Sequence, residues 1–136
     1  MTALLLAHAG ATLAMAGLAW FVQVVHYPLF ARVGDDAFVA YEAEHVRRTT
    51  LVVAPLMIVE AVTAGLLLVL SPSALTAVGA VLVVLVWLST ALVQVPLHRR
   101  LERGFDAPAQ RALVRTSWAR TALWSARGAV ALALVA

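Results

Sequence analysis

Several histidine and carboxylate side chains stand at spacings that suit metal binding. In "YEAEHVRR", Glu42 and His45 have the i, i+3 spacing that puts both on one helix face, as in the carboxylate metal sites of helical bundles. His26 and His98 lie in two similar stretches, "VQVVHYPLFARVG" and "LVQVPLHRRLERG". Together the four residues offer nitrogen and oxygen ligands suited to iron, copper or zinc, and haem is a further candidate. The alternative is that no cofactor binds, with His45 solvated and the other two histidines only hydrogen-bonded.

Two ionisable residues stand deep inside apolar segments. Glu60 and Arg127 each follow an Arg-Thr pair by eleven residues, which places both about 16 Å along their helices at a rise of about 1.5 Å per residue. A charge at this depth costs about 2.5–3.5 kcal/mol on insertion scales, so we predict that the two side chains face each other. Two interpretations stay open: a structural ion pair that fixes helix register, or a site that binds substrate, proton or cofactor.

Further polar residues recur at helical spacing and predict an internal pocket. Lipid offers no hydrogen-bond partners, so such faces should turn inward. One face comprises Trp87, Thr90, Gln94 and His98; another comprises Arg120, Trp124 and Arg127. The predicted catalytic residues are His26, His98, Glu60, Arg120 and Arg127, and the predicted pocket residues are Gln23, Gln94, Trp20, Trp87 and Trp124. By contrast, His8 is isolated and is expected at the membrane interface.

The composition indicates a membrane protein. Hydrophobic residues make up 63% of the 136 residues and charged residues 12%, against about 45–50% and 25% in soluble domains. Cysteine and lysine are absent, which excludes disulfides, thiolate metal sites and a lysine Schiff base. The net charge of +3 comes from arginines, which in membrane proteins set topology, so no nucleic-acid partner is predicted. The expected partners are the lipid bilayer and a lipophilic small molecule.

Four apolar stretches are long enough to cross a bilayer, whose core takes about 20 helical residues. They are residues 3–25, 51–70, 74–96 and 117–136. The chain is therefore predicted to be one all-α membrane domain, residues 1–136, forming a bundle of four transmembrane helices. Arginines concentrate in the first and third connections, which the positive-inside rule places in the cytoplasm. We thus expect a multi-pass protein of the cell inner membrane with both termini outside.

Each charged connection is predicted to contain a short amphipathic helix on the cytoplasmic surface. In "GDDAFVAYEAEHVRR" the expected N-cap is Asp36, and in "GFDAPAQRALVRTSW" Asp106 precedes Ala107 and Pro108 in the first turn. These surface helices would roof a polar pocket open to the cytoplasm.

The two halves of the chain resemble each other. Both run through an apolar helix, a P-L-x-x-R motif, a glycine, a charged segment and a second apolar helix. This order predicts two parallel repeats, residues 1–71 and 72–136, related by a pseudo-twofold axis along the membrane normal. Chance similarity between two apolar sequences is the alternative.

The "HYPLF" motif at residues 26–30 and "VQVPLHRRL" at residues 93–101 resemble the anthrone-oxygenase-like family of small four-helix membrane proteins. That family usually has asparagine where this sequence has His98. The resemblance implies oxygenation of a flat, lipophilic phenolic substrate.

Three functions are therefore weighed. The first is a membrane-embedded oxidoreductase in which His26 and His98 bind a metal or act as acid and base, while Arg120 and Arg127 stabilise a phenolate or oxyanion. The second is a small proton- or cation-coupled transporter that uses Glu60 and Arg127, and this hypothesis predicts a homodimer. The third is a non-catalytic accessory protein, in which the polar faces only hold the bundle together.

Overall fold

The structure is a computed structural model that describes residues 1–136 and contains helices and short connections only. The first long segment comprises α1 (Thr2–Phe21), a π-helical turn (Val22–His26), α2 (Tyr27–Leu29) and a 3-10 turn (Phe30–Arg32). It is followed by α3 (Asp35–Leu70), then by α4 (Ala74–Ser89), a second π-helical turn (Thr90–Gln94) and α5 (Val95–Leu101), and finally by α6 (Ala107–Val135). The predicted all-α bundle of four long helical segments is confirmed.

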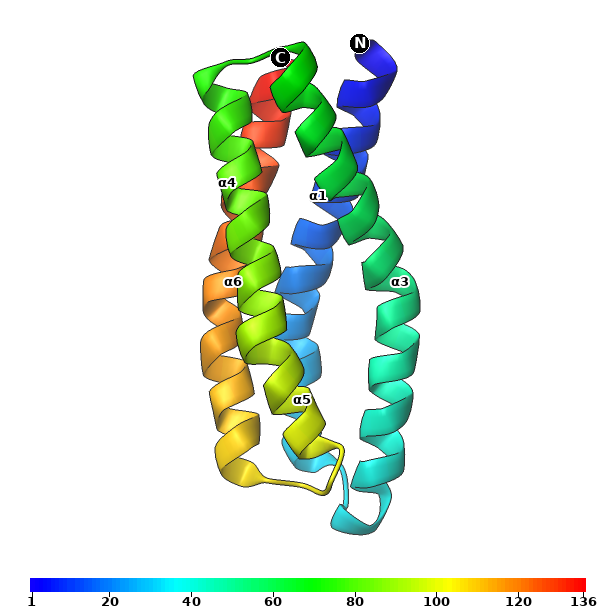
Figure 1. The fold of residues 1–136 in the computed structure, drawn as a ribbon. Helices are drawn as coiled ribbons and strands as arrows, with labels where there is room; N and C mark the ends of the chain where they lie inside the picture. The colour runs from blue at the N-terminus through cyan, green and yellow to red at the C-terminus, as the bar shows by residue number, and fades with distance from the viewer.

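The four segments run alternately up and down (Figure 1). Both chain termini lie at one end of the bundle, together with the turn between α3 and α4, and the two charged connections lie at the opposite end (Figure 1). We refer to that opposite end as the charged end. The two charged connections were predicted to share one side, and they do.

Three of the four segments are long and apolar enough to cross a membrane: Thr2–Arg32, Asp35–Leu70 and Ala74–Leu101. Their outer faces expose large aliphatic side chains such as Val69, Leu92 and Leu51, each more than 60% exposed. A bundle with such an apolar outer surface is suited to contact with lipid rather than with water. The fourth segment, α6, is long but does not reach the same apolarity, because Arg111, Arg115, Arg120 and Arg127 all lie on it.

The prediction of separate surface helices in the charged connections is wrong. Residues 36–50 form the first part of α3, which continues without a break to Leu70, and residues 107–116 form the first part of α6. The predicted N-cap at Asp36 is also wrong, since Gly34 takes that position and Asp36 lies in the first turn. No glycine or proline stands between Asp35 and Pro55 to stop the helix. The predicted pocket therefore has no roof of surface helices.

Side-chain caps explain where α4 and α6 begin. Ser73 caps α4 with a capping box, in which its side chain accepts from the Thr76 amide and the Thr76 hydroxyl accepts from the Ser73 amide. Asp106 caps α6 by accepting a hydrogen bond of 2.9 Å from the Ala109 amide, with Pro108 in the first turn as predicted.

The two π-helical turns stand at equal distances from a proline. Each ends two residues before the proline of a P-L-x-x-R motif, Pro28 or Pro96. A proline ring clashes with the carbonyl four residues earlier, at Val24 or Leu92, and both carbonyls lie within the π turns. The wider turn accommodates the clash without breaking the helix. This shared geometry is a further likeness between the halves, whose duplication stays a prediction.

Candidate metal centre and adjoining groove

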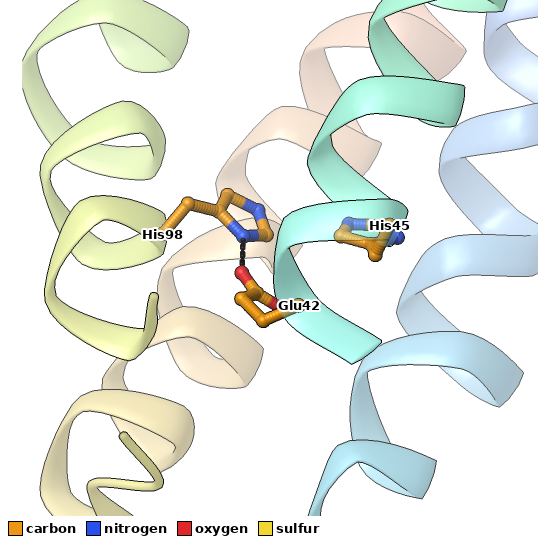
Figure 2. Close-up of side chains that lie close together, drawn as sticks. All are labelled: Glu42, His45 and His98. Atoms are coloured by element: carbon orange, nitrogen blue, oxygen red, sulfur yellow. Dashed lines mark hydrogen bonds and ion pairs between the residues drawn. The ribbon is translucent and has the colours of Figure 1, made fainter. Parts of the chain in front are cut away.

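Glu42, His45 and His98 come together at the charged end of the bundle. Figure 2 shows His98 of α5 and Glu42 of α3 pointing toward each other, with His45 one turn further along α3. Nδ1 of His98 and Oε1 of Glu42 are 2.5 Å apart. One ligating atom from each of the three residues lies within 4.8 Å of the other two. The pair Glu42 and His45, three residues apart on α3, thus lies beside His98, which is 56 residues from Glu42 along the chain.

A second layer of side chains orients the two histidines. Nε2 of His98 is 2.9 Å from the Tyr27 hydroxyl, and Nδ1 of His45 is 2.8 Å from Nε2 of His26 and 3.1 Å from the Thr49 hydroxyl. Nδ1 of His98, which contacts Glu42, and Nε2 of His45 are the ring nitrogens that this second layer does not use. Metal-bound histidines commonly use their other nitrogen for such a hydrogen bond.

Predicted ligand His26 therefore lies behind His45, and the three-residue group does not include it. The first π-helical turn ends at this residue. His26 is placed to orient the His45 ring rather than to join Glu42 and His98.

The cluster is largely shielded from water. Glu42 is fully buried, His45 is 9% exposed, and Phe30, with no exposed surface, packs against His45 with 5.1 Å between ring centroids.

A groove with a volume of about 600 Å³ adjoins the cluster. One wall is α3, from His45 to Ile58, and the other comprises α4, the second π-helical turn and α5, from Trp87 to Glu102. The groove is open to the outside of the bundle, where Ile58 and Trp87 are about half exposed. This volume lies within the range of small-molecule sites, and the opening faces the surface suited to lipid.

The sequence-predicted face of Trp87, Thr90, Gln94 and His98 lines the groove along its whole length, as expected from its spacing. Arg120 of α6 also lines it. Histidine and arginine gather at the charged end, and apolar side chains such as Met57 line the part nearer the middle of the bundle. The groove is therefore amphipathic along its axis.

The remaining predicted pocket residues lie elsewhere. Gln23 is buried, and its Nε2 donates to the Val114 carbonyl at 3.1 Å. Trp124 is 1% exposed within the central core. Trp20 is 48% exposed on the outer surface, where its Nε1 donates to the Ser125 hydroxyl.

Glu60 and Arg127 form the predicted ion pair, which is not part of the groove wall. Arg127 Nε donates to Glu60 Oε1, Arg127 Nη1 donates to the Gly79 carbonyl, and the Thr12 hydroxyl donates to Glu60 Oε1 at 2.9 Å. Both charged side chains are buried. Neither residue lines the groove, so the pair ties α1, α3, α4 and α6 together at mid-depth.

His8 was expected to be isolated at the membrane interface, and the expectation that it is isolated is wrong. His8 is 2% exposed, and its Nδ1 lies 2.9 Å from the Thr63 hydroxyl. The Thr63 hydrogen is directed to the Val59 carbonyl at 2.7 Å, so His8 is the donor. It extends the buried polar layer of Glu60 one turn toward the end with the termini.

Three parts of the site were not predicted from the sequence: Tyr27, Phe30 and Thr49. Thr49 follows His45 by four residues, so helical spacing was an available signal. Tyr27 and Phe30 lie inside the "HYPLF" motif, but their contacts with His98 and His45 depend on how the helices pack.

The fold and the cluster together define an α-helical bundle of membrane type with two histidines and one carboxylate grouped at the end of a lateral groove. Comparison with protein families, curated proteins and solved structures finds no match for this chain.

Proposed function

We propose that this protein is a membrane-embedded oxidoreductase that uses a metal ion held by Glu42, His45 and His98 to oxidise a lipophilic phenolic substrate. The observation that supports it best is the grouping of two imidazoles and one buried carboxylate at the polar end of a groove open to the outside of the bundle. Two histidines and one carboxylate with open coordination positions are the ligand set of non-haem iron(II) oxygenases.

The proposed reaction uses dioxygen as the oxidant. At a CH₂ group beside an aromatic ring, one oxygen atom becomes the carbonyl oxygen, and the other leaves as water with the two hydrogen atoms. Carbon loses four electrons and dioxygen gains four. Bound iron would supply the binding and activation of dioxygen. The apolar groove wall would hold the ring, and Arg120, which also lines the groove, would stabilise a phenolate.

The transporter hypothesis has less support. Glu60 and Arg127 are paired with each other, and neither lines the groove. The location in the cell inner membrane, with the charged end in the cytoplasm, is part of the proposal and is favoured by the arginines of the two charged connections.

Metal content tests the proposal. The protein is purified in mild detergent from iron-supplemented cells, and iron, copper and zinc are measured by mass spectrometry together with the visible spectrum. We expect about one iron per chain, lost in His45→Ala/His98→Ala and in Glu42→Gln. The matched control is Glu44→Gln, which changes a partly exposed carboxylate on the same helix. A wild-type protein that holds no iron and binds none when iron(II) is added without oxygen would overturn the metal centre.

A further inference from the structure

Two opposite charges at the charged end of the groove are unpaired. Arg99 and Glu102 both line the groove, three residues apart at the end of α5, where Arg99 is exposed and Glu102 is partly exposed. Neither residue forms an ion pair, with the other or with any other residue. The basic residue precedes the acidic one, which is the less favourable order for pairing within a helix. Both charges are therefore available to a ligand that enters the groove from outside.

The other basic side chains of the groove wall are less accessible than Arg99. His45 is buried, and the His98 side chain, which contacts Glu42, is 14% exposed. Arg120 is only partly exposed. Arg99 is thus the cation that an anionic group reaches first at the groove surface.

Arg99 and Glu102 lie at successive levels beyond the apolar part of their helical segment. The apolar stretch 74–96 ends three residues before Arg99, which is about 4.5 Å along the helix axis, and Glu102 lies about 4.5 Å farther out. In a bilayer the phosphate of a phospholipid lies next to the hydrocarbon, and the terminal group of the head lies farther out. The cation is therefore at the level of a phosphate, and the anion is at the level of the group that the phosphate carries.

We infer that the charged end of the groove binds a phospholipid whose phosphate carries a primary amine, as in phosphatidylethanolamine. The Arg99 guanidinium donates to the phosphate, and the Glu102 carboxylate accepts from the ammonium group. A phosphoglycerol head has a phosphate for Arg99 but no cation for Glu102. A phosphocholine head has both charges, but its quaternary nitrogen has no hydrogen to donate. The primary amine is the head that satisfies both side chains.

One acyl chain of this lipid fits the apolar part of the same groove. Val53, Met57 and Ala91 line that part, and the α3 wall from His45 to Ile58 extends for about 20 Å along the helix axis. The groove is open to the outside of the bundle, so a lipid enters it without leaving the bilayer. The inference requires neither a bound metal nor the proposed reaction, and a substrate that uses the groove would displace the chain.

The test compares three phospholipids with identical acyl chains and phosphoethanolamine, phosphocholine or phosphoglycerol heads. Their binding to the protein in mild detergent is titrated by native mass spectrometry. We expect wild-type protein to bind the phosphoethanolamine lipid about threefold to fivefold more tightly than the other two, the effect of one accessible ion pair. Arg99→Gln should weaken the binding of all three lipids by about the same factor. Glu102→Gln should remove the preference for the phosphoethanolamine head.

Two variants with the same changes of charge outside the groove are the matched controls. Arg103→Gln removes an exposed arginine four residues after Arg99, and Asp36→Asn removes an exposed carboxylate on α3. Neither residue lines the groove, so both variants should keep the wild-type affinities and their order.

A further variant tests whether the acyl chain lies in the groove. Ala91→Trp places a large side chain in the apolar part of the groove and should weaken the binding of all three lipids without changing their order. Its control is Val81→Trp on the outer surface of α4, where Val81 is 58% exposed and does not line the groove.

Four results would overturn the inference. The first is a wild-type protein that binds the three lipids equally or the phosphoglycerol lipid most tightly, and the second is a preference for phosphoethanolamine that survives in Glu102→Gln. The others are an Arg99→Gln variant that binds lipid as well as Arg103→Gln does, and an Ala91→Trp variant that binds as well as Val81→Trp does. Iron content is measured separately, so a lost lipid preference beside normal iron content counts against this site alone.

Discussion

Replacing Glu60 by leucine tests the buried ion pair at the middle of the bundle. In the wild-type protein, Glu60 accepts hydrogen bonds from Arg127 and Thr12, and both charged residues are at most 1% exposed. Glu60→Leu keeps a side chain of similar volume but leaves the Arg127 charge with the Gly79 carbonyl as its remaining hydrogen-bonded partner. The effect should therefore come from the stranded charge rather than from a cavity.

Removing one partner of a buried pair costs about 3–5 kcal/mol of folding free energy, because the other charge is left uncompensated. The lost Thr12 hydrogen bond adds about 1 kcal/mol. We expect Glu60→Leu to lower the free energy of unfolding by about 4–6 kcal/mol and Arg127→Leu, which keeps the Thr12–Glu60 bond, by about 3–5 kcal/mol. The assay is reversible denaturation in mixed micelles, followed by circular dichroism.

The double variant separates the stranded charge from other causes. Glu60→Leu/Arg127→Leu removes both charges, so its stability should return to within about 1–2 kcal/mol of wild type. The exchange Glu60→Arg/Arg127→Glu should recover part of the lost stability if the pair acts only as a structural link. A Glu60→Leu variant as stable as wild type, or a double variant no better than the single ones, would refute the reasoning.

Two further predictions concern helix geometry and can be checked by thermal unfolding. Deleting Leu92, an exposed residue of the second π-helical turn, should restore the clash of Pro96 with the helix and lower the free energy of unfolding by about 3 kcal/mol. The same deletion combined with Pro96→Ala should cost clearly less stability. Equal losses of stability in the two variants would contradict the role given to the π turn. Asp106→Ala should lower the unfolding temperature more than Asp106→Asn, which can still cap α6. The Ala109 amide, followed by Arg100, lowers the pKa of Asp106, so its stabilising effect should be complete above the ordinary aspartate pKa and fade as pH falls through the lowered one. An Asp106→Ala variant with an unchanged unfolding temperature at every pH would show that the cap adds nothing.

Some of the site follows from local sequence alone. The face of Trp87, Thr90, Gln94 and His98 is fixed by helical spacing, and all four line the groove. Glu60 and Arg127 were matched by depth, because a buried charge in an apolar helix needs a partner at the same level. Neither prediction requires knowledge of how the chain folds back on itself.

Other parts of the site depended on geometry that local patterns do not encode. The amphipathic pattern of residues 36–50 gives the apolar face of a helix but not the direction of its axis, so a continuous α3 was read as a separate surface helix. Helical spacing also does not say which neighbouring helix a side chain will meet, and the extra residue of the first π turn (Val22–His26) shifts the side chains at its end. His26 stands at the end of such a turn, and it lies behind His45 instead of beside Glu42 and His98.

The sequence by itself determined a helical, lipid-matched bundle with its arginine-rich connections at one end, because composition and helical periodicity act over short stretches of chain. Only the tertiary structure decided which polar residues meet. Glu42 and His98 are 56 residues apart, and His8 and Thr63 are 55 apart. Such pairs form because a polar group buried in an apolar bundle must find its hydrogen-bond partner on whichever helix packs against it.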